Sequence, residues 1–461
     1  MSQQDKRFRY EQLRKELPYF IYESYNISVK DNVLEVVYHF ILAGRYHFYP
    51  SFTLLKRDFY SLGKDDEIKE DVRLQNLVFH IGMVELISYW KAACPRQVII
   101  KPFSLSPEQV AWWKEVYFQG LGEFFYLNSI VPDKNSFMQI ECADAIPTEP
   151  FDINLDNKLI IPVGGGKDSV VTLELLSHHF DTLALIMNPR GACFFTAETA
   201  GFPRERIIEI NRTIDPLLLE LNKQNFLNGH TPFSALLAFQ CLLASALTGR
   251  RHIALSNESS ANEATIEDTQ INHQYSKSIA FETDFRWYVA RYISPAFNYF
   301  SFLRPLNELQ IGRLFAGFPA YFDVFKSCNV GSKTDIWCGH CPKCLFAFII
   351  LSPFISRDRM IEIFGKDMFA DEALWPYLRQ LSGIDNIKPF ECVGTVDEVN
   401  LALKIILAGR GKEELPVLLQ SYAESIASSH TKQTLSHTLL NEFNEDHFLQ
   451  KDFLRILKKA L

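Results

Sequence analysis

The chain has 461 residues, enough for about three domains of the usual size. Hydrophobic residues make up 47% and charged residues 22%, a globular composition that excludes a disordered or low-complexity protein. The net charge of −8 disfavours a protein that coats nucleic acid, since such proteins carry a basic excess. We therefore expect no nucleic-acid partner.

The first residues, MSQQDKRFRYEQLRKELPYF, contain no apolar signal-peptide core. One longer uncharged stretch, residues 231–249, is interrupted by polar side chains and falls short of the roughly 20 apolar residues of a bilayer span. Thr231 suits an N-cap, Pro232 the first helical position and Gly249 the C-terminal cap. These features predict a buried helix in a cytoplasmic protein without a membrane partner.

The N-terminal third, residues 1–150, is predicted to be a mixed α+β domain. Two runs rich in β-branched and aromatic residues, 20–29 and 33–42, flank a short polar turn and predict a hairpin. Residues 74–93 have the apolar spacing of a helix. The prolines at 132, 147 and 150 mark the expected boundary.

From residue 151 onward, short apolar strands alternate with helices, which indicates an α/β fold with a central parallel sheet and helices on both faces. We expect this domain to cover residues 151–360, and residues 361–461 to be a mainly helical C-terminal region with a break at 388–395. The expected strands are 159–163, 182–188, 206–211 and 252–257, and the expected helices are 168–179 and the one beginning near 231.

A glycine loop follows the first of these strands and is the sharpest local signal. It consists of Gly164, Gly165, Gly166, Lys167, Asp168 and Ser169, with a helix expected from Asp168. Glycines let backbone N–H groups approach an anion, and a helix N-terminus adds unpaired donors. The loop therefore predicts phosphate binding, although the spacing is neither that of a Walker A loop nor GxGxxG. The alternative is a tight turn that merely requires glycine.

This loop resembles the SGGxDS loop of the ATP pyrophosphatase superfamily, whose members cleave ATP to AMP and pyrophosphate. The resemblance implies an adenine-nucleotide α-hydrolase-like pyrophosphate-loop fold that binds ATP. One position departs from the pattern, because Gly164 stands where the superfamily has serine. Asp168 and Ser169 match it.

Nine cysteines are present, and four of them cluster as C-x9-C-x2-C-x2-C: Cys328, Cys338, Cys341 and Cys344. Four thiolates at such spacing close a tetrahedral shell around Zn²⁺, so we predict a structural zinc knuckle rather than a disulfide framework. Free cysteines, a redox dithiol and an iron–sulfur cluster stay open as alternatives. The cluster resembles the zinc knuckle of 7-cyano-7-deazaguanine synthases.

Further segments resemble the UDP-N-acetylmuramoyl-L-alanyl-L-glutamate epimerase family over about residues 150–400. They are PVGGGKDSVVTLELL, SNESSAN, NHQYSKSIAFE, SFLRPLNELQI, SCN, WCGHCPKCLF and KPFECVGT. The resemblance implies an isomerase of peptidoglycan precursor synthesis that uses ATP and Mg²⁺. Its substrate would be UDP-MurNAc-L-Ala-L-Glu, whose terminal L-Glu it inverts while releasing AMP and pyrophosphate. Residues 1–150 would then help to bind this large substrate.

The α-hydrogen beside a free carboxylate is barely acidic until the carboxylate is adenylated. Inversion then needs a base that removes this hydrogen from one face and an acid that returns a proton to the other. Cys392 and Glu391 lie in a polar break, where a thiolate of lowered pKa can act as base. His273 is a candidate base or phosphate ligand, and Lys277 a candidate for neutralising phosphate charge. Each also has a purely structural interpretation.

Asn257 and Glu258 follow an expected strand end, where the sites of open α/β sheets gather, and Arg304 offers a bidentate fork that suits an anion. Asn257 and Glu258 are expected to contact Mg²⁺ or the substrate, and Arg304 to hold a carboxylate or phosphate. The alternative for each is a structural contact.

Two other functions stay open. The first is a superfamily enzyme that adenylates a different substrate, such as an amide ligase or a nucleobase- or tRNA-modifying enzyme. The second is a non-catalytic protein that binds ATP and zinc. The sequence does not fix the oligomeric state.

Overall fold

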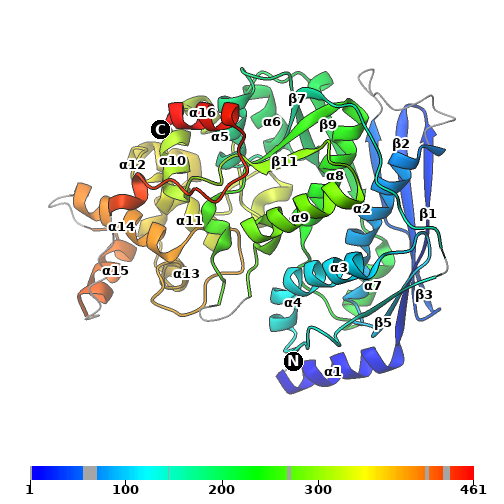
Figure 1. The fold of residues 1–461 in the computed structure, drawn as a ribbon. Coiled ribbons are helices and arrows are strands. Elements are labelled where there is room, and N and C mark those ends of the chain that lie inside the picture. Colours follow the sequence, from blue (N-terminus) through cyan, green and yellow to red (C-terminus); the bar gives the residue numbers. More distant parts are fainter. Residues whose placement is uncertain (1–2, 56–69, 144, 267–270, 411–414, 429–436) are drawn as a thin grey trace. The chain divides into compact units, whose positions relative to one another are not determined.

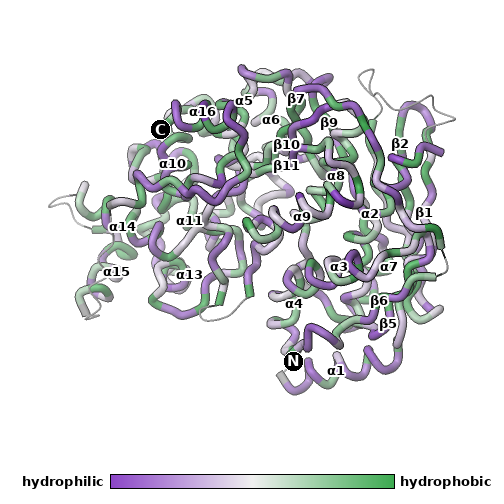
Figure 2. The backbone as a smooth tube through the Cα atoms, in the orientation of Figure 1, coloured by the Kyte–Doolittle hydropathy of each residue, from purple (hydrophilic) through white to green (hydrophobic). Residues whose placement is uncertain are grey.

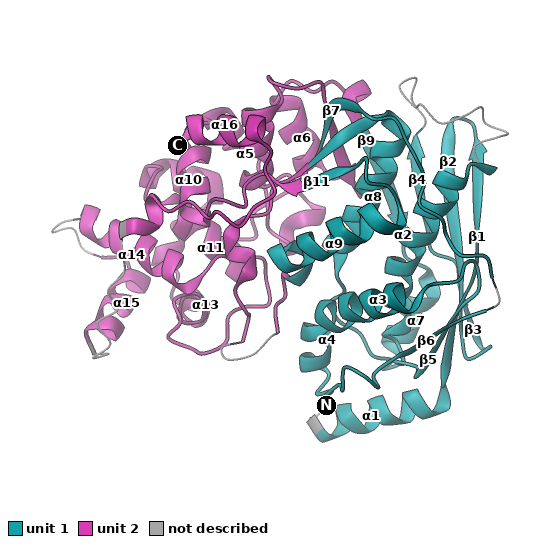
Figure 3. Cartoon of the chain, viewed as in Figure 1, with its two compact units in different colours: residues 1–160, 208–253, 275–299 teal, residues 161–207, 254–274, 300–461 magenta. Residues whose placement is uncertain are grey.

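The chain folds around one large sheet, as seen in a computed structural model that describes residues 3–55, 70–143, 145–266, 271–410, 415–428 and 437–461 (Figure 1). Eleven strands are hydrogen-bonded in the order β11-β10-β7-β8-β9-β4-β2-β1-β5-β6, with β3 paired to β2. Two compact units divide the chain: residues 1–160, 208–253 and 275–299, and residues 161–207, 254–274 and 300–461 (Figure 3). The three-domain division stays a prediction.

The sheet is mixed. β10 pairs with β7 in parallel, as do β1 with β5 and β5 with β6, whereas β1–β2, β2–β4 and β4–β9 are antiparallel. The predicted α/β class is therefore confirmed, and the central parallel sheet expected for residues 151–360 is part of a larger, mixed sheet. The reason is that the N-terminal hairpin joins the same sheet instead of forming its own.

Four strands cross the boundaries between the units: β7 (Asp156–Pro162), β9 (Ile207–Thr213), β10 (Arg250–Leu255) and β11 (Asn298–Ser301). Each of the strands predicted at 159–163, 206–211 and 252–257 overlaps one of these. Their apolar runs are buried, which is why they are recognisable from sequence.

The first unit contains the predicted hairpin. Asp31 and Asn32 turn the chain with φ of 51° and 61°, the positive values of a primed hairpin turn. The remaining elements are α1 (Gln3–Glu16), β1 (Tyr19–Lys30), β2 (Val33–Leu42), β3 (Tyr46–Phe48), β4 (Ser51–Leu55), α2 (Val72–Trp90), β5 (Gln97–Ile100), α3 (Pro107–Gly120), α4 (Gly122–Leu127), β6 (Gln139–Cys142), α7 (Pro216–Lys223), α8 (Phe233–Thr248) and α9 (Ile279–Tyr292).

Helix α8 is the uncharged stretch predicted to be a buried helix, and nearly all of its residues are buried. Gly249 caps it in the left-handed conformation with φ of 64°, as predicted, but the helix begins at Phe233, with Pro232 as N-cap instead of Thr231. In contrast to this apolar helix, α1 is mostly hydrophilic (Figure 2). Among the described residues, no helix is long and apolar enough to cross a membrane.

The second unit contains the glycine loop and the cysteine cluster. Its helices after residue 356 confirm the helical pattern predicted there, and residues 388–395 form the predicted break. Its elements are α5 (Lys167–Leu176), β8 (Thr182–Met187), α6 (Gly191–Thr199), α10 (Glu308–Ala316), α11 (Pro342–Leu351), α12 (Arg357–Phe364), α13 (Trp375–Leu381), α14 (Val396–Arg410), α15 (Val417–Ser428) and α16 (Lys451–Ala460).

The C-terminal segment of the second unit packs beside α5 and α10 (Figure 1). Phe453 of α16 stacks on Phe180, with ring centroids 4.7 Å apart. The Asn307 side chain donates to the Leu439 carbonyl at 2.6 Å, and Gln310 donates to the Glu442 carbonyl at 2.8 Å. The segment thus supports the two helices whose first residues form the site described below.

Gly82 of α2 has no room for a side chain. A Cβ atom there would lie 2.1 Å from the Tyr22 hydroxyl oxygen and 2.7 Å from Cε1 of Tyr38. We expect Gly82→Ala to destabilise the protein by about 1–3 kcal/mol, the usual cost of overpacking a core. Gly409→Ala is the matched control, because nothing lies within 4 Å of its Cβ and alanine stabilises a helix by up to about 1 kcal/mol. Urea unfolding measures both, and equal midpoints would contradict this account.

Candidate functional site

The glycine loop connects β7 to α5, and its middle residue must be glycine. Gly165 has a φ of +80°, and a Cβ there would lie 3.0 Å from the backbone carbon of Ala192 and the backbone nitrogen of Cys193. A Cβ at Gly164 would meet nothing within 4 Å. A serine would therefore fit at 164, so the departure from the superfamily pattern has no steric cause.

Helix α5 begins at Lys167, one residue before the predicted start, with Gly166 as its N-cap. Because this N-cap is a glycine, it offers no side chain to cap the helix start. The Ser169 hydroxyl donates to the Gly166 carbonyl at 2.8 Å. The start of α5 therefore keeps the backbone donors that suit an anion.

A carboxylate–lysine cluster, consisting of Lys167, Asp168, Glu258 and Glu308, lies beside this helix start. Lys167 is only 6% exposed, and its ammonium donates to the carboxylates of Asp168 and Glu308. Asp168, Glu258 and Glu308 offer carboxylate oxygens within 4.8 Å of one another, a group that could hold a metal ion. The sequence analysis named every member as a candidate except Glu308, which lies in the segment SFLRPLNELQI that resembles the epimerase family.

The cluster concentrates negative charge in a buried place. Burial raises the pKa of the Glu308 carboxyl well above its usual value, Lys167 lowers it in part, and Asp168, Glu258 and Glu398 raise it further. Burial lowers the pKa of Lys167, but Asp168 and Glu308 more than offset this, so that its pKa lies above the usual value. The Lys167 ammonium therefore stays charged, and the excess of carboxylates would favour the binding of a further cation in the cluster.

Asn257 and Arg304 lie close to Glu258, beyond the ends of β10 and β11, and make structural hydrogen bonds there. Arg304 has no exposed surface, and its Nη1 donates to the Glu258 carbonyl at 2.6 Å. Its Nη2 donates to the Ser301 hydroxyl at 3.3 Å, and Asn257 donates to the same hydroxyl at 3.0 Å. These contacts position the backbone of Glu258.

Glu398, in the first turn of α14, was not predicted. Its Oε1 accepts hydrogen bonds from the Ser260 hydroxyl at 2.6 Å and from the Glu308 backbone N–H at 2.7 Å. Its Oε2 accepts from the N–H of Thr395. A local signal was present, because Thr395-x-x-Glu398 is the pattern of a capping box, although the pattern does not reveal the remote partners.

The structure brings three of the predicted proton-transfer candidates onto neighbouring segments. The segment 387–393, which contains Glu391 and Cys392, contacts residues 263–266 and 271–274, which include His273. Burial raises the pKa of Glu391, while Lys343 lowers it, Cys392 and Cys341 raise it, and His273 lowers it. The fourth candidate, Lys277, is half-buried and belongs to the first unit.

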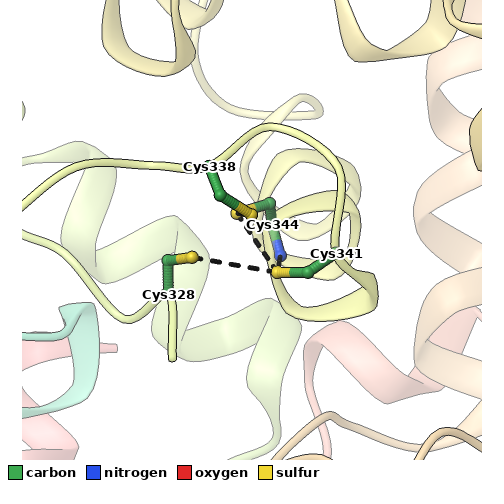
Figure 4. A group of neighbouring side chains, drawn as sticks. All are labelled: Cys328, Cys338, Cys341 and Cys344. Carbon is green, nitrogen blue, oxygen red and sulfur yellow. Dashed lines mark hydrogen bonds between the residues drawn. The ribbon is translucent and has the colours of Figure 1, made fainter. Parts of the chain in front are cut away.

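The four predicted cysteines converge on one point (Figure 4). Sγ–Sγ distances are 3.8 Å between Cys328 and Cys341, 3.7 Å between Cys338 and Cys344, and 3.4 Å between Cys341 and Cys344. Thiolates around tetrahedral zinc lie about 3.8 Å apart when each Zn–S bond is about 2.3 Å. The cluster is therefore consistent with a structural zinc site, in agreement with the prediction.

The segment that carries the first cysteine also contacts the glycine loop. The Lys326 N–H donates to the Gly165 carbonyl at 2.8 Å. The Asp335 carboxylate accepts from the backbone N–H groups of Gly191 at 3.1 Å and Ala192 at 2.9 Å, at the start of α6. The segment around the cysteine cluster thus contacts both the glycine loop, at Gly165, and the start of α6, which packs against Gly165.

Two family domains match this chain: the MurL N-terminal domain over residues 11–302 and the MurL C-terminal domain over residues 324–436. The chain belongs to the MurL family. The prediction of an enzyme of the isomerase class is confirmed, because the similar proteins are named epimerases.

Three proteins named UDP-N-acetyl-alpha-D-muramoyl-L-alanyl-L-glutamate epimerase are similar to the chain. The Salinispora tropica protein is 37% identical over 72% of this chain and 73% of its own length, and the Micromonospora sp. protein 36% over 73% and 76%. The Xanthomonas oryzae pv. oryzae protein is 34% identical over 80% of this chain and 85% of its own length. No solved structure matches.

Metal binding by the cysteine cluster is testable by substitution. Because thiolate ligation is coupled to folding, we expect Cys341→Ser to lower bound zinc from about one ion per chain and to reduce the yield of folded protein. Elemental analysis of the purified protein measures the metal. Cys193→Ser, at another buried cysteine of the same unit, should keep its zinc. A stable wild type that contains no metal would contradict the assignment.

Proposed function

We propose that this protein inverts the terminal L-Glu of UDP-MurNAc-L-Ala-L-Glu to D-Glu, with adenylation of the glutamate carboxylate by ATP. The observation that carries the proposal is membership of the MurL family, together with relatives named for epimerisation of this compound. The reaction would be a step of peptidoglycan precursor synthesis. The large UDP-sugar would be bound in part by residues 1–150.

Adenylation explains why an epimerase would need ATP. The carboxylate oxygen attacks the α-phosphorus of ATP, pyrophosphate leaves, and a mixed anhydride forms. A base then removes the α-hydrogen, since the resulting enolate no longer lies beside a full carboxylate charge. An acid returns a proton to the opposite face, and water cleaves the anhydride to the carboxylate and AMP.

The glycine loop is the proposed site of the ATP phosphates, in a pyrophosphate-loop fold of the ATP pyrophosphatase type. Support comes from the backbone at Gly165, which no other residue could adopt without strain, and from the uncapped start of α5. Lys167 is unsuited to a direct phosphate contact while its ammonium is bound by Asp168 and Glu308. Its proposed role is to hold these carboxylates in place.

Mg²⁺ would be held by the carboxylates of Asp168, Glu258 and Glu308, whose oxygens are close enough to share an ion. Carboxylate oxygens are the protein ligands that Mg²⁺ prefers, and the bound ion would neutralise phosphate charge. Arg304 and Asn257 would act indirectly, by fixing the backbone at Glu258. Zinc at the four cysteines would be structural.

For the proton transfers we propose His273 and the pair Glu391 and Cys392, with Lys277 neutralising phosphate charge. The support is that the segments carrying His273 and Cys392 contact each other within the second unit. Burial keeps the pKa of Glu391 above its usual value, which suits a carboxyl group that exchanges protons near neutral pH.

The activity is tested by incubating the purified protein with ATP, Mg²⁺ and UDP-MurNAc-L-Ala-L-Glu, followed by chiral analysis of the glutamate. Wild type should form D-Glu, AMP and pyrophosphate together. Asp168→Ala should lower AMP formation by at least about 100-fold, since it removes a carboxylate from the proposed Mg²⁺ site. Asp358→Ala, on the first turn of α12, is a control that should keep full activity. Wild-type rates in the Asp168 variant would rule out the loop assignment.

The role of Cys392 is tested by Cys392→Ser, which should lose epimerisation and still form AMP slowly, because the anhydride then awaits hydrolysis without inversion. In D₂O, wild type should place deuterium at the α-carbon of the inverted product, and recovered substrate should carry little. Cys142→Ser, at another partly buried cysteine, serves as the matched control. Full epimerisation by Cys392→Ser would make the thiol structural and direct attention to Glu391 and His273.

A further inference from the structure

Glu398 is a buried carboxylate that joins three separate segments of the second unit. It is 1% exposed, and its two oxygens accept hydrogen bonds from Ser260, Glu308 and Thr395. Two of these donors adjoin or belong to the carboxylate–lysine cluster, because Ser260 follows Glu258 by two residues. The third ends the segment 391–395, which contains Glu391 and Cys392.

Local helix capping accounts for only one of these three bonds. The Glu398 N–H donates to the Thr395 hydroxyl at 3.2 Å, and its Oε2 accepts from the Thr395 N–H, which together make a capping box for α14. This uses one carboxylate oxygen. The other oxygen accepts both remote bonds, from residues 138 and 90 positions away in the sequence.

Gly394 shows how closely the segment 391–395 approaches the side chains of Glu308 and Glu398. A Cβ atom at this position would lie 2.4 Å from Oε2 of Glu398 and 3.0 Å from Cγ of Glu308. The backbone at Gly394 therefore packs directly on the side chains of Glu308 and Glu398, and a side chain at this position would push the backbone away from them.

We propose that Glu398 is a positioning residue, which holds segment 391–395 and its proton-transfer groups against the carboxylate–lysine cluster. The inference rests on the proposed function, because it assigns adenylation to one side of Glu398 and inversion to the other. Glu398 thereby ensures that the anhydride forms where the acid and base reach it. Loss of this contact separates the two steps.

The chemistry requires a carboxylate. All three partners donate hydrogens, and a carboxylate accepts at both oxygens without offering a donor of its own. In Glu398→Gln the amide NH₂ replaces one oxygen and opposes an N–H or O–H donor, so at least one bond is lost. Glu308 stays bonded to Lys167 and part of a helix, so the displacement falls mainly on segment 391–395.

The decisive quantity is the fraction of AMP-forming turnovers that yield D-Glu. We expect Glu398→Gln to lower this fraction about tenfold while AMP formation changes less than about threefold, which marks a loss of coupling rather than of nucleotide chemistry. Ser260→Ala removes a single donor and should lower the fraction by a smaller factor. Glu362→Gln, an exposed carboxylate of α12 paired with Arg359, is the control and should leave the fraction unchanged.

A second readout needs no activity. Hydrogen–deuterium exchange should accelerate at the backbone amides of Glu308 and Thr395 in Glu398→Gln and stay at the wild-type rate in Glu362→Gln. If Glu398→Gln does not fold, Ser260→Ala supplies both measurements, because it keeps the capping box of α14 intact.

Either of two results would overturn the positioning role of Glu398. An unchanged fraction of AMP turnovers giving D-Glu in Glu398→Gln, or unchanged exchange at both amides, would exclude the positioning role. Wild type that forms no AMP would instead refute the proposed adenylation, and the exchange measurement would then decide whether Glu398 joins these segments.

Discussion

The structure of the site depends on one buried ion pair, between the Lys167 ammonium and the Glu308 carboxylate. Lys167 is the first residue of α5 and Glu308 the first residue of α10, so the pair ties the glycine loop to a second helix start. Removing one partner of a buried pair costs about 3–5 kcal/mol, because the other charge is left without compensation. The loop conformation and the position of the carboxylates are therefore stabilised by the same interaction.

Around this pair, helix-capping residues make the long-range contacts. Asn307 and Gln310 form the capping box of α10 and also donate to backbone carbonyls of the C-terminal segment. Glu398 completes the capping box of α14 and accepts from the first N–H of α10. Because a helix start presents several unpaired donors at once, one side chain can satisfy local and remote groups together. The starts of α10 and α14 are joined in this way.

Local patterns predicted the elements well and their connections poorly. The Asp31-Asn32 turn, the strand before Gly164 and the Gly249 cap were recognisable because each depends on neighbouring residues. Glu308 and Glu398 were missed as site residues, since their importance comes from partners 141 and 90 positions away. The mixed sheet was missed for the same reason, because strand alternation does not reveal where the N-terminal hairpin pairs.

Contacts with the glycine loop explain why the cysteine cluster lies where it does. A metal site closed by four thiolates contributes no open ligand position, and its value lies in fixing the backbone that carries it. That backbone includes Lys326, which bonds to Gly165, and Asp335, which caps the start of α6 against which Gly165 packs. A Cβ at Gly191 would lie 2.4 Å from the Asp335 carboxylate, so this contact also requires a glycine. A metal ion held by the four cysteines would therefore stabilise the glycine loop as well, through two hydrogen-bonded contacts rather than through any shared ligand.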